Sequence, residues 1–310
     1  MQANLNKNIN NERLDNKGLV IASYGRHYLI EPAYCLGTSI QCFARGKKTE
    51  IAVGDLVNYE MASENQGIIT KILPRKTLLK RSNIYKTKLF AANIDQLVFV
   101  LATEPKFSED LLARSLIAAE DSGLKPIIIL NKIDIEDKLA AAKARLQIYR
   151  ELNYQIIEVS ALQTNNTIQY LKQLFTHQSS LLLGQSGTGK STLINLLIPN
   201  AQVLTQEISQ ALATGKHTTT LTRLFHLPNG GTLLDSPGFQ EFGLSYLSEG
   251  RLERAFVDFR PYLGQCRFHN CHHINEPDCA ILKAVKNQKV TQFRYMLYAQ
   301  LLKEIDKKPY

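Results

Sequence analysis

Gly184-Gln185-Ser186-Gly187-Thr188-Gly189-Lys190-Ser191 is the stretch that decides the fold, because it satisfies the pattern G-x-x-x-x-G-K-S. The apolar run 181–183 precedes it, and a helical stretch over residues 192–197 follows it. This succession of strand, loop and helix predicts a phosphate-binding loop, in which glycines let backbone N–H groups curl around phosphate oxygens. We expect Lys190 to neutralise the β and γ phosphates and Ser191 to ligate Mg²⁺, with Thr192 as the last phosphate contact.

A second motif predicts which base the nucleotide carries. Asn131-Lys132-Ile133-Asp134 follows the apolar run 126–130, at the carboxyl end of an expected strand. The Asp134 carboxylate can accept from both N1–H and N2–H of guanine, whereas adenine offers neither donor and would leave the carboxylate unpaired. We expect Asn131 to reach the base edge and brace the phosphate loop, and the Lys132 stem to cover the ring. Ser160-Ala161 follows the next apolar run and can offer a backbone N–H to the guanine O6.

Two further segments are suited to the γ-phosphate and its metal ion. Asp235-Ser236-Pro237-Gly238 follows the apolar run 232–234 and matches D-x-x-G, whose Asp acts on Mg²⁺ through a water and whose Gly N–H meets the γ-phosphate. The polar segment 215–220 is rich in threonine and stands where a GTPase has its first switch. One threonine there should complete the Mg²⁺ shell. We favour Thr219, although the spacing does not exclude Thr218 or Thr220.

A cluster of cysteines and histidines near the C-terminus predicts a metal site. Three of the five cysteines fall in this cluster, which favours a metal over disulfides. Cys266, Cys271, His273 and Cys279 would form a closed tetrahedral Cys₃His set, which indicates one structural Zn²⁺ ion. His269 or His272 could take the place of His273, and the alternative without metal is a set of buried thiols beside exposed histidines.

Composition limits the class of protein and its partners. The chain of 310 residues with 44% hydrophobic content is long enough for two or three cores. No apolar run reaches the roughly 18 residues of a membrane span, and the polar opening lacks a signal-peptide pattern, so we expect a cytoplasmic protein without membrane contact. Residues 1–90 hold 14 Lys/Arg against 7 Asp/Glu, residues 91–250 hold 12 against 15, and residues 251–310 hold 11 against 6. Basic flanks around an acidic centre favour a nucleic acid partner over a merely solvated surface.

The hydrophobic pattern divides the chain into a tail and three domains. Residues 1–16 are expected to be a disordered tail, and residues 17–79 hold about five short alternating runs typical of an OB-fold β-barrel. Residues 80–247 alternate strands and helices and predict a parallel α/β domain. Residues 248–310 predict a helical zinc-binding domain. Seven basic residues with no acidic residue among them suggest a phosphate-contacting linker after the barrel: Lys71, Arg75, Lys76, Lys80, Arg81, Lys86 and Lys88.

The order of the nucleotide motifs is rotated relative to an ordinary GTPase, which runs from the phosphate loop through the switch threonine and D-x-x-G to N-K-x-D and Ser-Ala. Here N-K-x-D and Ser-Ala come first. With these flanks the chain resembles the circularly permuted GTPases, and among them the ribosome small subunit-dependent GTPase A family. The resemblance favours His273 as the fourth zinc ligand. It also implies a monomer that binds the small (30S) ribosomal subunit and its rRNA late in assembly, hydrolyses GTP to GDP and phosphate when docked, and helps to release assembly factors.

The catalytic group is the least determined part of the expected site. Phe239 follows D-x-x-G, where many GTPases place a glutamine that orients water. His217, in the first switch, is the nearest candidate, and the resemblance implies that this histidine acts once the protein is docked. A solvated loop histidine is the alternative. Two other functions share the motifs, namely a GTP-gated factor acting on another RNA and a nucleotide-binding scaffold without turnover.

Overall fold

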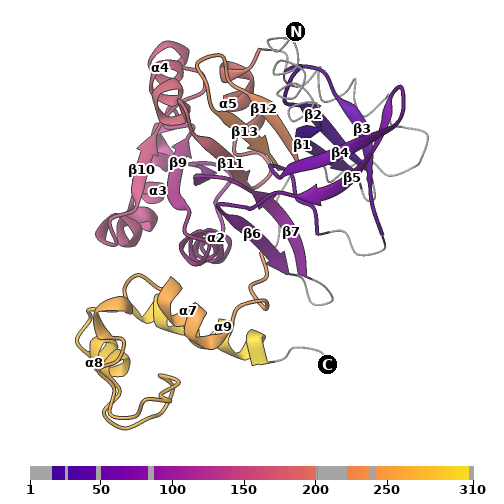
Figure 1. Ribbon diagram of the computed structural model, residues 1–310. Helices are drawn as coiled ribbons and strands as arrows, with labels where there is room; N and C mark the ends of the chain where they lie inside the picture. The colour runs from indigo at the N-terminus through magenta and orange to yellow at the C-terminus, as the bar shows by residue number, and fades with distance from the viewer. Residues whose placement is uncertain are drawn as a thin grey trace, which may run out of the picture.

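The computed structural model describes residues 16–24, 27–46, 50–82, 87–199, 201, 222–236 and 242–306 (Figure 1). Its N-terminal part is a barrel of five strands: β1 (Lys17–Tyr24), β2 (His27–Pro32), β3 (Ile40–Ala44), β4 (Leu56–Ser63) and β5 (Gln66–Ile72). The strand order is β1-β2-β3-β5-β4, and a β1–β4 pairing closes the barrel. Alternate side chains such as Val20, Ile30 and Tyr59 fill its interior. The expected OB-fold barrel is therefore confirmed.

A two-stranded hairpin follows the barrel, made of β6 (Leu78–Ser82) and β7 (Thr87–Ala92). The expectation of a phosphate-contacting linker fails at Arg75 in this region. Its guanidinium donates to both carboxylate oxygens of the buried Asp55, at 2.6 and 2.7 Å, and to the carbonyl oxygen of Glu50. Arg75 therefore stabilises the barrel, because a positive charge committed to a buried carboxylate is not available to a phosphate.

The central domain is built on the six strands β8 (Gln96–Ala102), β9 (Lys125–Asn131), β10 (Gln155–Glu158), β11 (Ser179–Gly184), β12 (Arg223–His226) and β13 (Thr232–Asp235). They run in the order β10-β9-β8-β11-β13-β12, and all neighbours are parallel except β12, which is antiparallel to β13. Every residue of β8 is buried, as expected for a strand covered on both faces. The predicted parallel α/β domain is thus observed.

Helices cover both faces of this sheet, because alternate side chains of the strands point in opposite directions. Phe99 and Leu101 of β8 face α2 (Glu109–Asp121) and α3 (Glu136–Glu151) in one core. Val98 and Val100 face α4 (Thr164–Phe175) and α5 (Lys190–Leu197) in a second core. Figure 1 shows the two helix pairs on opposite sides of the sheet.

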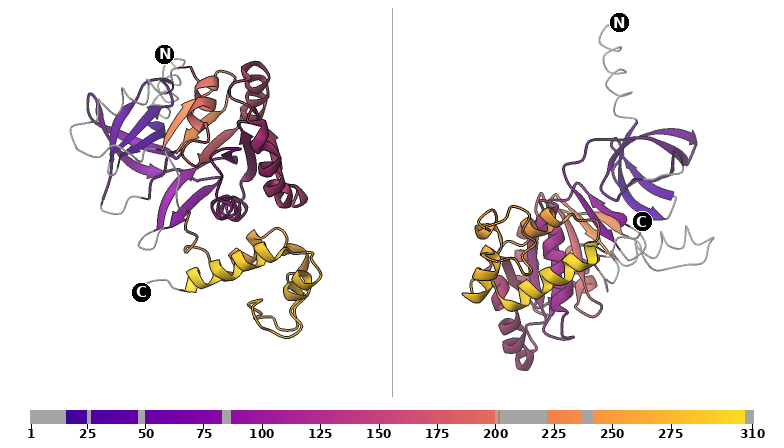
Figure 2. Two further views of the ribbon diagram at one scale, coloured as in Figure 1. Left: turned by 180° about the vertical axis from the view of Figure 1, so that it is seen from behind. Right: turned by 90° about the horizontal axis from the view of Figure 1, so that it is seen from below.

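The C-terminal part contains α7 (Glu249–Ala255), the short 3₁₀ helix η1 (Arg260–Tyr262), α8 (Ala280–Lys286) and α9 (Gln292–Asp306). It lies on the α2 side of the sheet, away from α4 and α5 (Figures 1 and 2). The side chains of Phe256, Phe259 and Tyr298 form an aromatic cluster that belongs to the same core as α2. The C-terminal part therefore closes one face of the central domain.

The barrel extends the central sheet beyond its last strand, β12. Ala22 of β1 pairs with Arg223 of β12, which makes a continuous sheet of eleven strands. Beside this pairing, His226 Nε2 of β12 lies 2.6 Å from Glu31 Oε2 of β2. Among the described residues, no helix combines the length and the apolar character that crossing a membrane would need.

Candidate functional site

The predicted nucleotide motifs gather at one edge of the central sheet. Asn131 ends β9, Gly184 ends β11 and Asp235 ends β13, while Ser160 follows the end of β10 by two residues. Because β9, β10, β11 and β13 run in the same direction, these residues meet at their common carboxyl ends. Ligands of open α/β sheets bind at this edge.

Asn131 joins three of the motifs through one side chain. Its Nδ2 donates to the Thr188 carbonyl oxygen of the phosphate loop at 2.9 Å, and its Oδ1 accepts from the Ala161 backbone N–H at 3.1 Å. Asn131 is only 1% exposed. A Cβ on Gly189 would lie 2.3 Å from Asn131 Nδ2, and Gly189 also has a φ of +83°, so this position requires glycine. The observed contacts match the expectation that Asn131 braces the phosphate loop.

Ser160 orients the acid that is expected to read the base. Its hydroxyl donates to Asp134 Oδ1 at 2.5 Å and accepts from the Leu162 N–H at 3.2 Å. A carboxylate fixed in this way has a defined orientation, and because Oδ1 keeps a second lone pair, both oxygens can accept from the paired donors of guanine. The structure therefore brings Asp134, Ser160 and Ala161 together, as the sequence predicted.

The segment after β8 contributes contacts that the sequence did not indicate. Thr103 Oγ1 donates to the Lys132 carbonyl oxygen at 2.7 Å, and Lys132 Nζ donates to the Glu104 carbonyl oxygen at 2.9 Å. Both ends of Lys132 are thus held, although its backbone has a φ of +60°. The only signal for this segment in the sequence is its place at the carboxyl end of a fully buried strand.

The phosphate loop has the backbone that its glycines predict. Gly187 and Gly189 have φ values of +80° and +83°, and Gly189 is the N-cap residue of α5. Thr188 is 1% exposed, and its hydroxyl donates to the Gln185 carbonyl oxygen inside the loop at 2.9 Å. Gln185 Oε1 in turn accepts from the Ser108 backbone N–H at 2.7 Å. The loop is therefore held from within and from the start of α2.

The charged groups expected at the phosphates also meet. Lys190 Nζ donates to Asp235 Oδ1, which places the loop lysine beside the D-x-x-G carboxylate. Ser191 and Thr192 are exposed in the first turn of α5, and Ser186 is exposed at the tip of the loop. His217, Thr219 and Gly238 lie outside the described residues, as do Thr218, Thr220 and Phe239.

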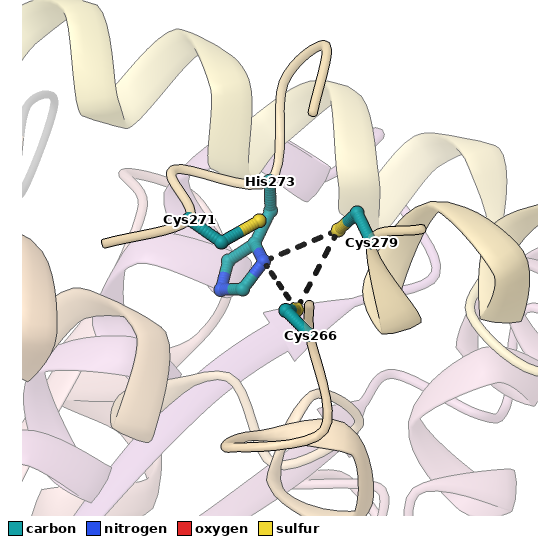
Figure 3. Close-up of side chains that lie close together, drawn as sticks. All are labelled: Cys266, Cys271, His273 and Cys279. Carbon is teal, nitrogen blue, oxygen red and sulfur yellow. Dashed lines mark hydrogen bonds between the residues drawn. The ribbon is translucent and has the colours of Figure 1, made fainter. Parts of the chain in front are cut away.

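The cysteine and histidine cluster forms a compact set of donor atoms (Figure 3). The ligand atoms of Cys266, Cys271, His273 and Cys279 all lie within 4.8 Å of one another. The Cys266 and Cys279 sulfurs are 3.8 Å apart, and His273 Nδ1 lies 3.5 and 3.3 Å from them. Sulfurs about 2.3 Å from a tetrahedral Zn²⁺ would be about 3.8 Å apart, so the four groups could hold such an ion.

The surroundings of the cluster distinguish the histidines. His273 Nδ1 faces the sulfurs, and its Nε2 lies 3.8 Å from Glu253 Oε1, the arrangement in which a carboxylate orients a metal-binding imidazole. His272 Nδ1 instead lies 2.5 Å from Glu249 Oε1. Among the described residues the set of possible metal ligands includes neither His272 nor His269.

Glu276 shapes the loop between the ligands, a role that the sequence did not reveal. Its carboxylate accepts from the backbone N–H groups of His272, Ile274 and Asn275 at 2.7, 2.8 and 3.0 Å. Although burial alone would raise its pKa, these donors stabilise the charged form and lower the pKa of Glu276 to about 2. The carboxylate therefore stays charged and keeps the loop folded at neutral pH.

The sequence matches a known family of GTPases and individual GTPases of the same family name. The family described as RsgA GTPase matches residues 72–245. A protein of Paraburkholderia xenovorans named small ribosomal subunit biogenesis GTPase RsgA is 58% identical over 294 residues, which cover 93% of this chain and 92% of that protein. A protein of the same name from Paraburkholderia phymatum is 59% identical over 291 residues, with coverages of 93% and 91%.

Solved structures agree in fold over nearly the full length. YjeQ from Thermotoga maritima superimposes with a TM-score of 0.70 at 28% identity, covering 95% of this chain and 99% of that one. YloQ, described as a circularly permuted GTPase, gives a TM-score of 0.66 at 28% identity, with coverages of 95% and 96%. A solved relative that matches nearly the whole chain is thus itself described as circularly permuted. The RsgA GTPase family matches more than half of this chain, and the curated relatives match nearly all of it. These matches show that the chain belongs to the RsgA GTPase family and is a GTP hydrolase.

Proposed function

We propose that this protein binds the small ribosomal subunit late in its maturation, hydrolyses GTP to GDP and phosphate while docked there, and helps to release assembly factors. The observation that carries the proposal is the junction at Asn131, which ties the base motif, the Ser-Ala motif and the phosphate loop into one site. The relatives with about 58% identity are named for biogenesis of that subunit. The basic flanks of the chain suit a partner rich in phosphate.

In the proposed site, Asp134 accepts the two guanine donors, the Lys132 stem covers the ring, and the Ala161 N–H faces O6. Asn131 reaches the base edge and holds the loop. The phosphates lie on the backbone of residues 184–192, where Lys190 neutralises their charge. Mg²⁺, when bound, supplies charge stabilisation between the phosphates. Ser191 and Thr219 would ligate the ion, Asp235 would hold a water on it, and the Gly238 N–H would meet the γ-phosphate.

His217 is our proposed catalytic residue. Phe239 offers no hydrogen bond to an attacking water, so free protein should turn over slowly. Docking on the subunit would bring the His217 imidazole within reach of that water. The proposal rests on residue types and spacing, since both positions lie outside the described residues.

We also propose that Cys266, Cys271, His273 and Cys279 hold one structural Zn²⁺ ion per chain. All four positions of a tetrahedral ion would be filled by protein, and three of these residues are buried, so the site leaves no open position for a substrate.

We also propose that the chain consists of three domains, residues 17–79, 80–247 and 248–310. We expect the protein to be a monomer. We also expect it in the cytoplasm, where its ribosomal partner is assembled.

The decisive experiment measures GTP hydrolysis by the full chain with and without purified small ribosomal subunits. We expect strong stimulation by the subunit and no comparable effect of large subunits or total tRNA at equal phosphate concentration. Equal turnover with all three additions would reject the small subunit as the activating partner. Product formation also separates an enzyme from a scaffold that only binds nucleotide.

A further inference from the structure

Helix α7 carries two sets of charged side chains that face different neighbours. Glu249 and Glu253, four positions apart, lie beside residues 266–279, which we call the metal-binding loop. The Glu249 carboxylate is 2.5 Å from His272 Nδ1, and the Glu253 carboxylate is 3.8 Å from His273 Nε2. Arg251 points the other way, and its guanidinium donates to both carboxylate oxygens of Asp121, at 2.8 and 2.6 Å. Asp121 is the last residue of α2. Helix α7 therefore joins the metal-binding loop to α2.

Two further ion pairs join α2 to the C-terminal part. Arg260 Nη2 of η1 lies 2.7 Å from Glu120 Oε2. Arg114 makes a two-point contact with Glu304 of α9, with both distances at 2.7 Å. Bidentate pairs of this kind fix orientation as well as distance. The C-terminal part is thus oriented by contacts at the middle and at the end of α2.

The other end of α2 lies at the phosphate loop. Ser108 is its N-cap residue, with the hydroxyl accepting from the Leu111 N–H at 3.2 Å. The backbone N–H of the same serine donates to Gln185 Oε1 at 2.7 Å. A helix of 13 residues spans about 20 Å, so α2 connects the phosphate loop with α7 as one rigid element.

The junction between α2 and α7 is polar at its solvent-facing rim, where a pocket opens. A cavity of about 450 Å³ lies there, lined by Glu120, Asp121, Arg251, Arg254, Ala255 and Arg260. The carboxylates of the two pairs are largely buried, with side chains 4% exposed at Asp121 and 16% exposed at Glu120, while the arginines lie at the surface, so a displacement of α2 moves the paired guanidinium groups with it. The open pocket beside these pairs leaves room for α7 to shift with α2.

We propose that α2 and α7 transmit the state of the phosphate loop to the metal-binding loop. Phosphates held by the loop backbone shift Gln185, Gln185 moves the N-terminus of α2, and the Asp121–Arg251 and Glu120–Arg260 pairs carry that movement to α7 and His273. This route is separate from the chain segment that follows D-x-x-G. It rests on the proposed binding of nucleotide at the phosphate loop, and it can operate in both directions, because coupling between two sites is reciprocal.

The test is hydrogen–deuterium exchange on the full chain with its metal, with and without saturating GDP. GDP binding is measured in the same samples, so that absent binding, which would refute the proposed function, is told apart from absent coupling. We expect GDP to slow exchange in both α2 and α7, by about two- to fivefold in α7, the range that one or two ion pairs with a surface arginine can supply. A GDP response confined to α2 would overturn the proposal.

The double variant Arg251→Gln/Arg260→Gln removes two of the pairs without touching the nucleotide site. Both arginines are exposed, but the Asp121 carboxylate is left buried without its partner, so thermal unfolding is measured on the same samples to show that the variant is folded. In this variant α2 should still respond to GDP, while the response of α7 is lost. The matched control is Arg150→Gln, which removes a 2.7 Å pair with Glu158 away from both helices. An unchanged α7 response in the double variant would assign the coupling to the segment after D-x-x-G and overturn the proposal.

Discussion

The substitution Asn131→Ala tests whether one buried amide holds the nucleotide site together. It removes the 2.9 Å bond to the Thr188 carbonyl and the 3.1 Å bond from the Ala161 N–H. Each buried polar group left without a partner costs about 1–3 kcal/mol. Thr188 is 1% exposed, whereas Ala161 is partly exposed and can recruit water, so we expect a total loss of about 2–4 kcal/mol.

This loss should divide between the free energy of unfolding and the affinity for GDP, because Asn131 organises both the fold and the site. Urea unfolding without nucleotide gives the first quantity, and calorimetric titration with GDP gives the second. Every 1.4 kcal/mol of lost affinity raises the Kd about tenfold. Asn131→Asp refines the test, because it keeps the acceptor for Ala161 but places a carboxylate oxygen against the Thr188 carbonyl.

Asn166→Ala is the control, since Asn166 is exposed on α4 and should change stability by about 0.5 kcal/mol or less. A summed loss below about 1 kcal/mol in Asn131→Ala would refute the reasoning. It would mean that the three motifs hold their positions without this side chain.

Four other perturbations test separate parts of the proposals. Asp134→Asn should weaken GTP binding and shift preference toward xanthosine triphosphate, and a competition assay with unchanged GTP preference would contradict this. Elemental analysis of the unmodified protein, purified without chelators, should find one zinc per chain, and protein without zinc would reject the metal. Cys271→Ser should lose this zinc and destabilise residues 248–310 while GDP still binds. His217→Ala should abolish most of the subunit-stimulated hydrolysis in single-turnover assays but keep GTP affinity and subunit binding, whereas full stimulation would place the catalytic group elsewhere. Glu276→Gln should destabilise the metal-binding loop at neutral pH. The Glu276 pKa is lowered from 4.5 to about 2, so the carboxylate stabilises the fold above pH 4.5, and this contribution disappears as the pH falls toward 2. Thermal unfolding with the same pH dependence in the variant and the unmodified protein would exclude the role.

Local patterns in the sequence predicted the parts of the molecule that depend on neighbouring residues. The alternation that gives the barrel strands, the glycines of residues 184–189 and the spacing of the three cysteines are all set within short segments. The parallel arrangement then placed Asn131, Gly184 and Asp235 at one edge, since carboxyl ends of parallel strands coincide. Fold and candidate site could therefore be predicted together.

Contacts between distant segments could not be predicted in this way. Arg114 and Glu304 are 190 residues apart, and Ser108 and Gln185 are 77 apart, so no spacing rule links them. Such partners are chosen by how the helices pack. Arg75 shows the same limit for charge, because its type and neighbours suggested a phosphate contact, whereas the fold brings Asp55 against it.

The position of β8 determines the order in which this protein can be completed during synthesis. The barrel is closed once β5 has emerged at Ile72, so it can fold while the rest of the chain is still being made. Strand β8 ends at Ala102, yet one of its two neighbours, β11, begins only at Ser179. The core on its α2 side also includes Phe256 and Tyr298, which are translated still later. A nascent chain therefore carries a finished barrel together with an uncovered apolar strand until nearly all of its residues have left the ribosome.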